Sequence, residues 1–177
     1  MKSLNTIHVF IAAFLSSAMF WAGSANANLG YDSGLYWGSG LSRIVLKGVP
    51  GNPDFLVPMI SANIESGDNL MYQFRFAYGG RGDTFADLDR SIGLYAKYHL
   101  WSDGFVRPFA MVGYTSTKYT NNTFFSQSSG TTIGLSAGIG LKFATSEVMH
   151  YAVEILGLNR ENDHINTAVT AKVYYSF

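Results

Sequence analysis

Cysteine is absent from the 177 residues, which excludes a disulfide framework and thiol chemistry. An excess of charge of either sign is also lacking, because 12 Lys and Arg residues balance 12 Asp and Glu residues. This balance argues against nucleic acid as a partner and against a basic helix lying on a membrane surface. After residue 27 there is no run of about 18 apolar residues, the length that a membrane-spanning helix requires.

The first 27 residues have the pattern of a secretory signal peptide. Lys2 is their only charge, residues 9–22 are mainly apolar, and Ala25-Asn26-Ala27 supplies the small side chains that a signal peptidase requires. A transmembrane anchor is the alternative, but the apolar run is short and Ser16-Ser17 interrupts it. We therefore predict a signal peptide over residues 1–27 and one exported domain over residues 28–177.

The rest of the chain alternates apolar with polar residues, which is the side-chain period of a β-strand. In residues 70–78, for example, Tyr72 and Phe74 fall on one face, and Gln73 and Arg75 fall on the other. No segment after the signal peptide has a helical period. The pattern predicts eight strands, at residues 35–46, 59–66, 70–78, 91–100, 106–114, 132–143, 149–156 and 166–177.

The connections between these segments alternate between long and short. Polar or Gly- and Pro-rich stretches form the long ones, whereas tight turns form the others. This asymmetry is typical of an up-and-down barrel in an outer membrane, with short periplasmic turns and long extracellular loops. A soluble barrel of the lipocalin type would also alternate, but it would keep its apolar face inside. The long connections are expected at residues 48–54, 79–89, 117–130 and 158–165.

The two faces of the strands favour the membrane. One face carries bulky apolar residues without charge from Leu70 to Phe177, and the other combines glycines with charged side chains. Aromatic residues make up 15% of the chain, which fits the aromatic belts found at membrane interfaces. We therefore predict an all-β fold, an eight-stranded antiparallel up-and-down transmembrane β-barrel in which the last strand pairs with the first.

Three stretches carry a family resemblance: residues 107–114 (RPFAMVGY), residues 134–143 (GLSAGIGLKF) and the ending 173–177 (VYYSF). They resemble the small outer-membrane β-barrel superfamily of Gram-negative bacteria, which includes the OmpA transmembrane domain, OmpX, Ail and the opacity proteins. The resemblance implies export through the periplasm to the outer membrane and contact with its lipid and lipopolysaccharide, as a monomer. It also implies that Phe177 is a signal for the outer-membrane assembly machinery. About activity it says little.

The polar face predicts a group of charged side chains inside the barrel. Eight strands leave an interior that side chains just fill, and an isolated buried charge is costly, so we expect a network of ion pairs that plugs the lumen. The excess of bases over acids leaves a second interpretation, a narrow channel for small, anionic solutes. The lumen charge network is expected to comprise Arg75, Lys97, Arg107, Lys142, Glu154 and Lys172.

Catalysis is not expected, because no set of nucleophile, base and orienting residue can be assembled. The remaining enzymatic alternative is lipid A modification, for which Glu161, Asp163 and His164 are the clustered candidates. No cofactor or metal is expected, since the spacing of the aspartates around residue 85 fits no defined calcium loop.

The polar outer loops are the expected place of function, because loops on a rigid scaffold commonly bind partners. We expect a role in envelope integrity or in binding host or environmental surfaces. Arg81-Gly82-Asp83 matches an integrin-binding tripeptide. Coincidence in a Gly-rich polar loop is the favoured interpretation of this match, and recognition is the alternative.

Overall fold

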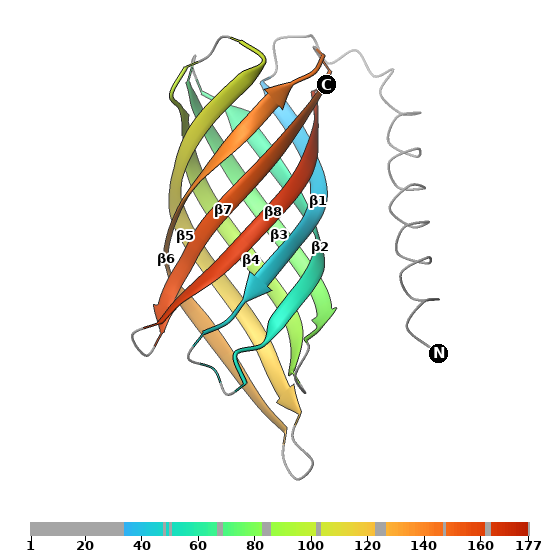
Figure 1. Cartoon of the computed structure of the whole chain (residues 1–177), viewed down its shortest axis with the longest axis vertical. Helices are drawn as coiled ribbons and strands as arrows, with labels where there is room; N and C mark the ends of the chain where they lie inside the picture. The colour runs from blue at the N-terminus through green and yellow to red at the C-terminus, as the bar shows by residue number, and fades with distance from the viewer. Residues whose placement is uncertain are drawn as a thin grey trace, which may run out of the picture. The chain divides into compact units, whose positions relative to one another are not determined.

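The computed structural model describes residues 34–47, 49, 51–66, 69–82, 86–101, 104–122, 127–146, 148–161 and 164–176. The chain forms a closed barrel in which each strand pairs with the next one in the sequence (Figure 1). No helix among the described residues is long and apolar enough to cross a membrane. The strands are β1 (Leu35–Val45), β2 (Asp54–Glu65), β3 (Leu70–Arg81), β4 (Ala86–His99), β5 (Val106–Asn122), β6 (Gln127–Ala144), β7 (Met149–Glu161) and β8 (His164–Ser176).

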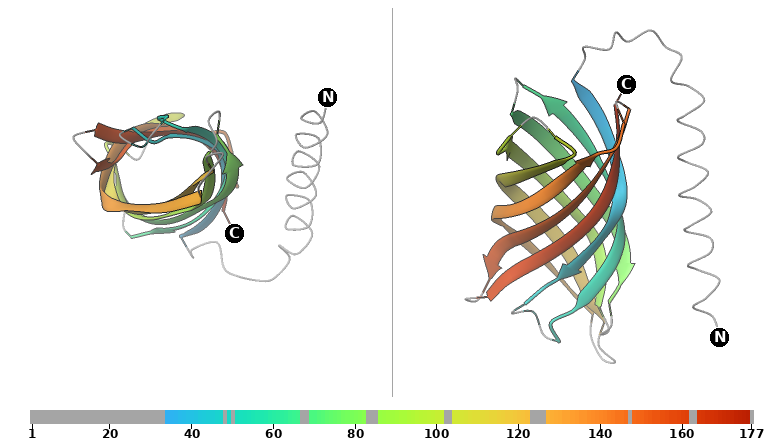
Figure 2. Two further views of the ribbon diagram at one scale, coloured as in Figure 1. Left: turned by 90° about the horizontal axis from the view of Figure 1, so that it is seen from below. Right: turned by 45° about the horizontal axis from the view of Figure 1, so that its top comes forward.

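The barrel closes through antiparallel pairing of β1 with β8. The ladder runs from Tyr36 opposite Ser176 to Val45 opposite Thr167, and β1 pairs with β2 along its other edge. An end-on view shows the complete ring (Figure 2). The prediction of an eight-stranded antiparallel barrel closed by its last strand is confirmed.

From β3 to β8, the two faces of each strand are also as predicted. Leu94, Ile133 and Ile139 point outward, with exposed fractions of 62%, 69% and 66%. Gln73 and Lys97, on the opposite face, are 1% and 2% exposed inside the barrel. The outer surface therefore presents apolar side chains to lipid, while polar residues fill the middle of the lumen.

The boundaries expected for the long connections were wrong. Pairing of β5 with β6 continues from Thr117 opposite Thr132 to Asn122 opposite Gln127, so most of the expected loop 117–130 is strand. Strands likewise occupy much of the expected connections 79–89 and 158–165. The physical reason is that the outward face of a strand beyond the membrane meets water and is polar, as at Lys118 and Thr120, while the inward face stays buried, as at Thr117 and Tyr119. The outward row of apolar residues that marks a strand in lipid is then missing from the sequence.

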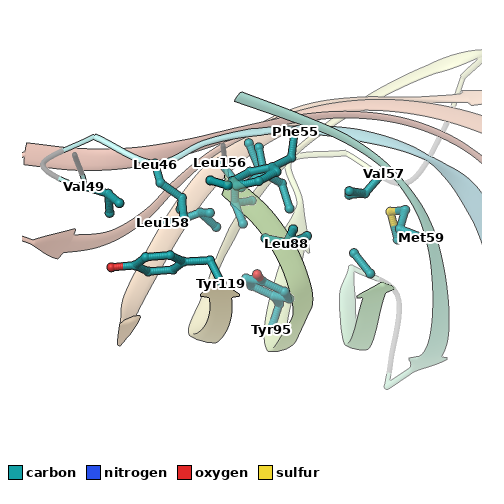
Figure 3. Close-up of a cluster of buried hydrophobic side chains, with 14 of the residues drawn as sticks. Leu46, Val49, Phe55, Val57, Met59, Leu88, Tyr95, Tyr119, Leu156 and Leu158 are labelled. Carbon is teal, nitrogen blue, oxygen red and sulfur yellow. The ribbon is translucent and has the colours of Figure 1, made fainter. Parts of the chain in front are cut away.

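The barrel has two ends. The outer end carries the β1–β2, β3–β4, β5–β6 and β7–β8 connections, and the inner end carries the other three turns. Apolar side chains fill the lumen toward the outer end, and Phe55 and Leu156 there are fully buried (Figure 3). This apolar layer consists of Leu46, Val49, Phe55, Val57, Leu88, Tyr119, Leu156 and Leu158.

Candidate functional site

Glu154 on β7 is the centre of the charged side chains in the lumen. Its side chain is 1% exposed and forms ion pairs with Arg75 of β3, Lys97 of β4 and Lys172 of β8. The Lys97 Nζ lies 2.5 Å from Glu154 Oε1, and the Tyr174 hydroxyl donates to the same oxygen at 3.2 Å. One carboxylate therefore faces three cations in a space without exposure to bulk water.

Neighbouring groups compensate part of this excess of positive charge. Lys97 donates to the Tyr174 hydroxyl at 2.7 Å, and its Nζ lies 4.3 Å from the centroid of the Phe109 ring. An aromatic face attracts a cation, and more strongly where water is excluded. The Arg75 guanidinium donates to Gln73 Oε1 at 3.2 Å, and Gln73 in turn donates to Asn63 Oδ1 at 2.8 Å. The result is a continuous polar layer across the lumen, on the inner-end side of the apolar layer.

The two other predicted lumen cations lie apart from Glu154. Lys142 Nζ is 3.6 Å from Glu65 Oε1 and 4.8 Å from the centroid of the Tyr36 ring, near the inner end. Arg107 is partly exposed there and donates through Nε to the Gly104 carbonyl at 3.2 Å. The six predicted residues thus form one cluster around Glu154 and a second, looser group at the inner end.

The sequence reasoning missed the uncharged members of the polar layer. Tyr174 and Gln73 fall on the predicted lumen face, but their hydrogen bonds to the charged cluster depend on residues from other strands. His99 and His150 were also missed. Both are 7% exposed, and neither ring nitrogen of His99 has a hydrogen-bond partner among the described residues. The alternation held the signal, since His99 shares a strand face with Lys97, and His150 shares one with Glu154.

The remaining predicted positions are only partly described. Arg81 ends β3, and Gly82 donates from its amide to the Ala86 carbonyl at 2.8 Å. A Cβ on Gly82 would lie 3.0 Å from the Phe55 ring, so this glycine is packed at the wall rather than displayed in an open loop. Asp83, Asp163 and Phe177 lie outside the described residues.

The β5–β6 hairpin extends beyond the strand that follows it. Pairing of β6 with β7 ends at Ala137 opposite Gly157, whereas pairing of β6 with β5 continues to Gln127. Residues 127–136 therefore have a strand on one side and no ladder partner on the other among the described residues. Figure 1 shows this hairpin reaching past its neighbours.

The sequence and the fold were compared with known proteins. A family model, the outer membrane protein beta-barrel domain, matches residues 10–177. No curated protein sequence matches the chain.

Several solved structures share the fold. Neisserial surface protein A (NspA) is 19% identical, with a TM-score of 0.67 over 82% of this chain and 98% of that chain. The N-terminal barrel of OprF from Pseudomonas aeruginosa is 16% identical, with a TM-score of 0.65 and coverage of 82% and 98%. Ail from Yersinia pestis is 17% identical, with a TM-score of 0.56 and coverage of 82% and 97%. At these identities the likeness is one of fold.

Proposed function

Because the chain belongs to the outer membrane protein beta-barrel domain family, we propose that it acts at the cell surface as a binding or adhesion protein. Its place is the Gram-negative outer membrane, as for the barrels of the same fold. The binding element in this proposal is the outer part of the β5–β6 hairpin. The lumen serves as a plug that stabilises the barrel, without catalysis.

The observation that carries the proposal is the unpaired edge of β6. An unpaired edge offers backbone N–H and C=O groups to an extended segment of another protein, which can add to the sheet as a further strand. Natural edges are usually protected from such pairing by charged residues or proline. Residues 127–136 contain neither, and Ser129 and Thr131, beyond the apolar surface, are exposed.

The contents of the lumen support a plug rather than the alternative of a channel. An interior of eight strands is just wide enough for side chains to fill. Here the charged cluster around Glu154 spans the middle, and the apolar layer around Phe55 closes the outer part. A role in surface contact also fits Ail, the attachment invasion locus protein of Yersinia pestis, which has been crystallised with the heparin analogue sucrose octasulfate.

Adhesion of bacteria that produce the protein tests this function. Cells are applied to cultured epithelial cells and, separately, to heparin-coated wells. In the first variant an Asn-Gly turn replaces residues 121–128, which shortens the hairpin with a turn suited to antiparallel strands. We expect adhesion to fall, because the tip of the hairpin and the outermost edge residues, 127 and 128, are removed.

A point substitution tests the edge itself. Thr131→Lys places a charge on the exposed edge of β6 and should weaken strand addition, so adhesion should fall. Thr145→Lys is the matched control, because it adds the same charge at an exposed position of the inner end and should leave adhesion unchanged. Equal surface amounts are verified by antibody labelling. Undiminished adhesion of both hairpin variants, or no adhesion by the unaltered protein, would overturn the proposed function.

A further inference from the structure

The outward face of the barrel has a hollow near its outer end, on strands β3, β4 and β5. It lies on the side of the wall that faces away from the lumen, so the charged cluster around Glu154 plays no part in it. Its position and its charges point to a ligand of the membrane surface. The hollow is lined by Tyr78, Gly79, Asp89, Arg90 and Lys118, and also by Leu88, a residue of the apolar layer in the lumen that is only 1% exposed.

An irregularity in the strand pairing creates the hollow. The β3–β4 ladder passes from Tyr78 opposite Arg90 to Gly80 opposite Leu88 without pairing Gly79 or Asp89. The register of β4 with β5 also shifts between Leu88 and Arg90. A bulge of this kind re-aims side chains, and here it brings the neighbouring residues Asp89 and Arg90 to the outer surface together.

Gly79 keeps the hollow open. Its φ is +65°, a conformation that glycine adopts readily and other residues rarely do. A Cβ at this position would meet no atom within 4 Å, because it would project into the empty space. The backbone conformation of Gly79, and not only its missing side chain, therefore makes the wall recede at this point.

Two cations stand directly opposite each other at this site. Arg90 pairs with Lys118 across the β4–β5 ladder, and like charges in that position repel. Asp89 offsets part of the Lys118 charge, because its Oδ2 lies 3.7 Å from Lys118 Nζ, and it also accepts a hydrogen bond from Thr120. Arg90 is exposed and has no ion pair or hydrogen bond with the residues that the structure describes. An anion between the cations would relieve the repulsion.

The hollow lies at the level of lipid headgroups. The row of outward residues next to it, toward the inner end, is Phe76, Ile92, Ser116 and Ile133, and it belongs to the apolar surface. Tyr78, 65% exposed, stacks on Phe76 with ring centroids 6.2 Å apart. Aromatic side chains mark the boundary between hydrocarbon and headgroups in outer-membrane barrels. Arg90 and Lys118 therefore lie directly beyond the outer boundary of the apolar surface.

We propose that this hollow binds a phosphate group of an outer-leaflet glycolipid. The Arg90 guanidinium donates two parallel hydrogen bonds to the phosphate oxygens, and the Lys118 ammonium supplies a second positive charge. The Tyr78 ring packs against the adjoining sugar and acyl chains. This inference rests on the outer-membrane location alone and is independent of the adhesion proposed for β5–β6.

Binding of lipid A to the purified, refolded protein in detergent tests the inference. Native mass spectrometry measures the apparent dissociation constants of bisphosphorylated lipid A, of dephosphorylated lipid A, and of phosphatidylcholine. The test variant is Arg90→Gln with Lys118→Gln. The matched control is Arg43→Gln with Lys47→Gln, which removes two exposed positive charges at the same end of the barrel, one from β1 and one from the connection after it.

We expect the test variant to bind bisphosphorylated lipid A about tenfold more weakly than the unaltered protein, because charge-assisted hydrogen bonds are lost. The control and the other two lipids should show no such difference. Millimolar inorganic phosphate should not displace lipid A. Equal affinity of the test variant, an equal loss with dephosphorylated lipid A, or displacement by inorganic phosphate would overturn the proposal. Altered migration of unboiled protein on gels establishes that each variant is folded.

Discussion

At the scale of single residues, Glu154 is the side chain on which the lumen depends most. It is the shared partner of Arg75, Lys97 and Lys172, so its removal leaves three buried cations facing one another. Removal of one cation leaves the carboxylate paired with two others. Breaking a buried pair is costly chiefly because an uncompensated charge remains. The two kinds of substitution should therefore differ sharply in their effect on stability.

We predict that Glu154→Gln lowers the free energy of unfolding by about 3–5 kcal/mol, whereas Lys172→Met changes it by less than about 1 kcal/mol or raises it. The glutamine keeps the shape of the side chain and removes only its charge. Urea unfolding of the refolded protein in vesicles, followed by tryptophan fluorescence, measures both values. A Glu154→Gln barrel as stable as the unaltered one would contradict the role proposed for the charged cluster.

At the scale of structural elements, irregularities in the ladder carry more meaning than the regular strands. The bulge of β4 against β5 falls at Asp89 and Arg90, and the early end of β6–β7 pairing leaves residues 127–136 with no second ladder partner in the described part of the chain. Both features lie at the outer end, where the barrel leaves the lipid. There the sheet no longer needs to keep every backbone group paired, since water is available as a partner.

Gly79 allows the bulge to be tested separately from its charges. Gly79→Ala should lower the free energy of unfolding by about 1 kcal/mol, because the alanine is strained at positive φ although it has room. Gly104→Ala is the matched control, since its φ of +95° and its empty surroundings are similar but it lies at the inner end. Both should lose stability in urea unfolding, and only Gly79→Ala should also weaken lipid A binding. If Gly79→Ala binds lipid A as tightly as the unaltered protein, the conformation of Gly79 is not needed for the phosphate site.

At the scale of the whole molecule, the lumen holds two layers of different chemistry. The charged layer holds itself together by ion pairs and hydrogen bonds, and the apolar layer excludes water at the outer end. Either layer alone would hinder a hydrated ion. Together they separate this barrel from the wide, water-filled barrels of porins.

We therefore predict that the refolded protein produces no conductance steps in planar lipid bilayers. A general porin inserted under the same conditions is the positive control. The variant Phe55→Ala should also remain closed, because the cluster around Glu154 still spans the lumen. Reproducible steps from the unaltered protein would favour the narrow channel over the plug.

The sequence by itself determined the strand type, the number of strands and the face on which each side chain lies. These follow from an alternation of two residues, which is a local property of the chain. Where lipid borders one face, the pattern is strong, as in residues 70–78. Where the outward face leaves the lipid and becomes polar, as in residues 117–130, the apolar row vanishes and the strand boundaries could not be read.

Only the tertiary structure decided which side chains meet. Glu154 forms ion pairs with cations on β3, β4 and β8. Alternation along one strand does not show which residues of different strands lie at the same depth along the barrel axis. Depth follows from the register of every ladder around the ring, and one bulge changes it for all residues beyond. For the same reason, the pairing of Arg90 with Lys118 and the free edge of β6 were not visible in the sequence. Both depend on where ladders shift or end.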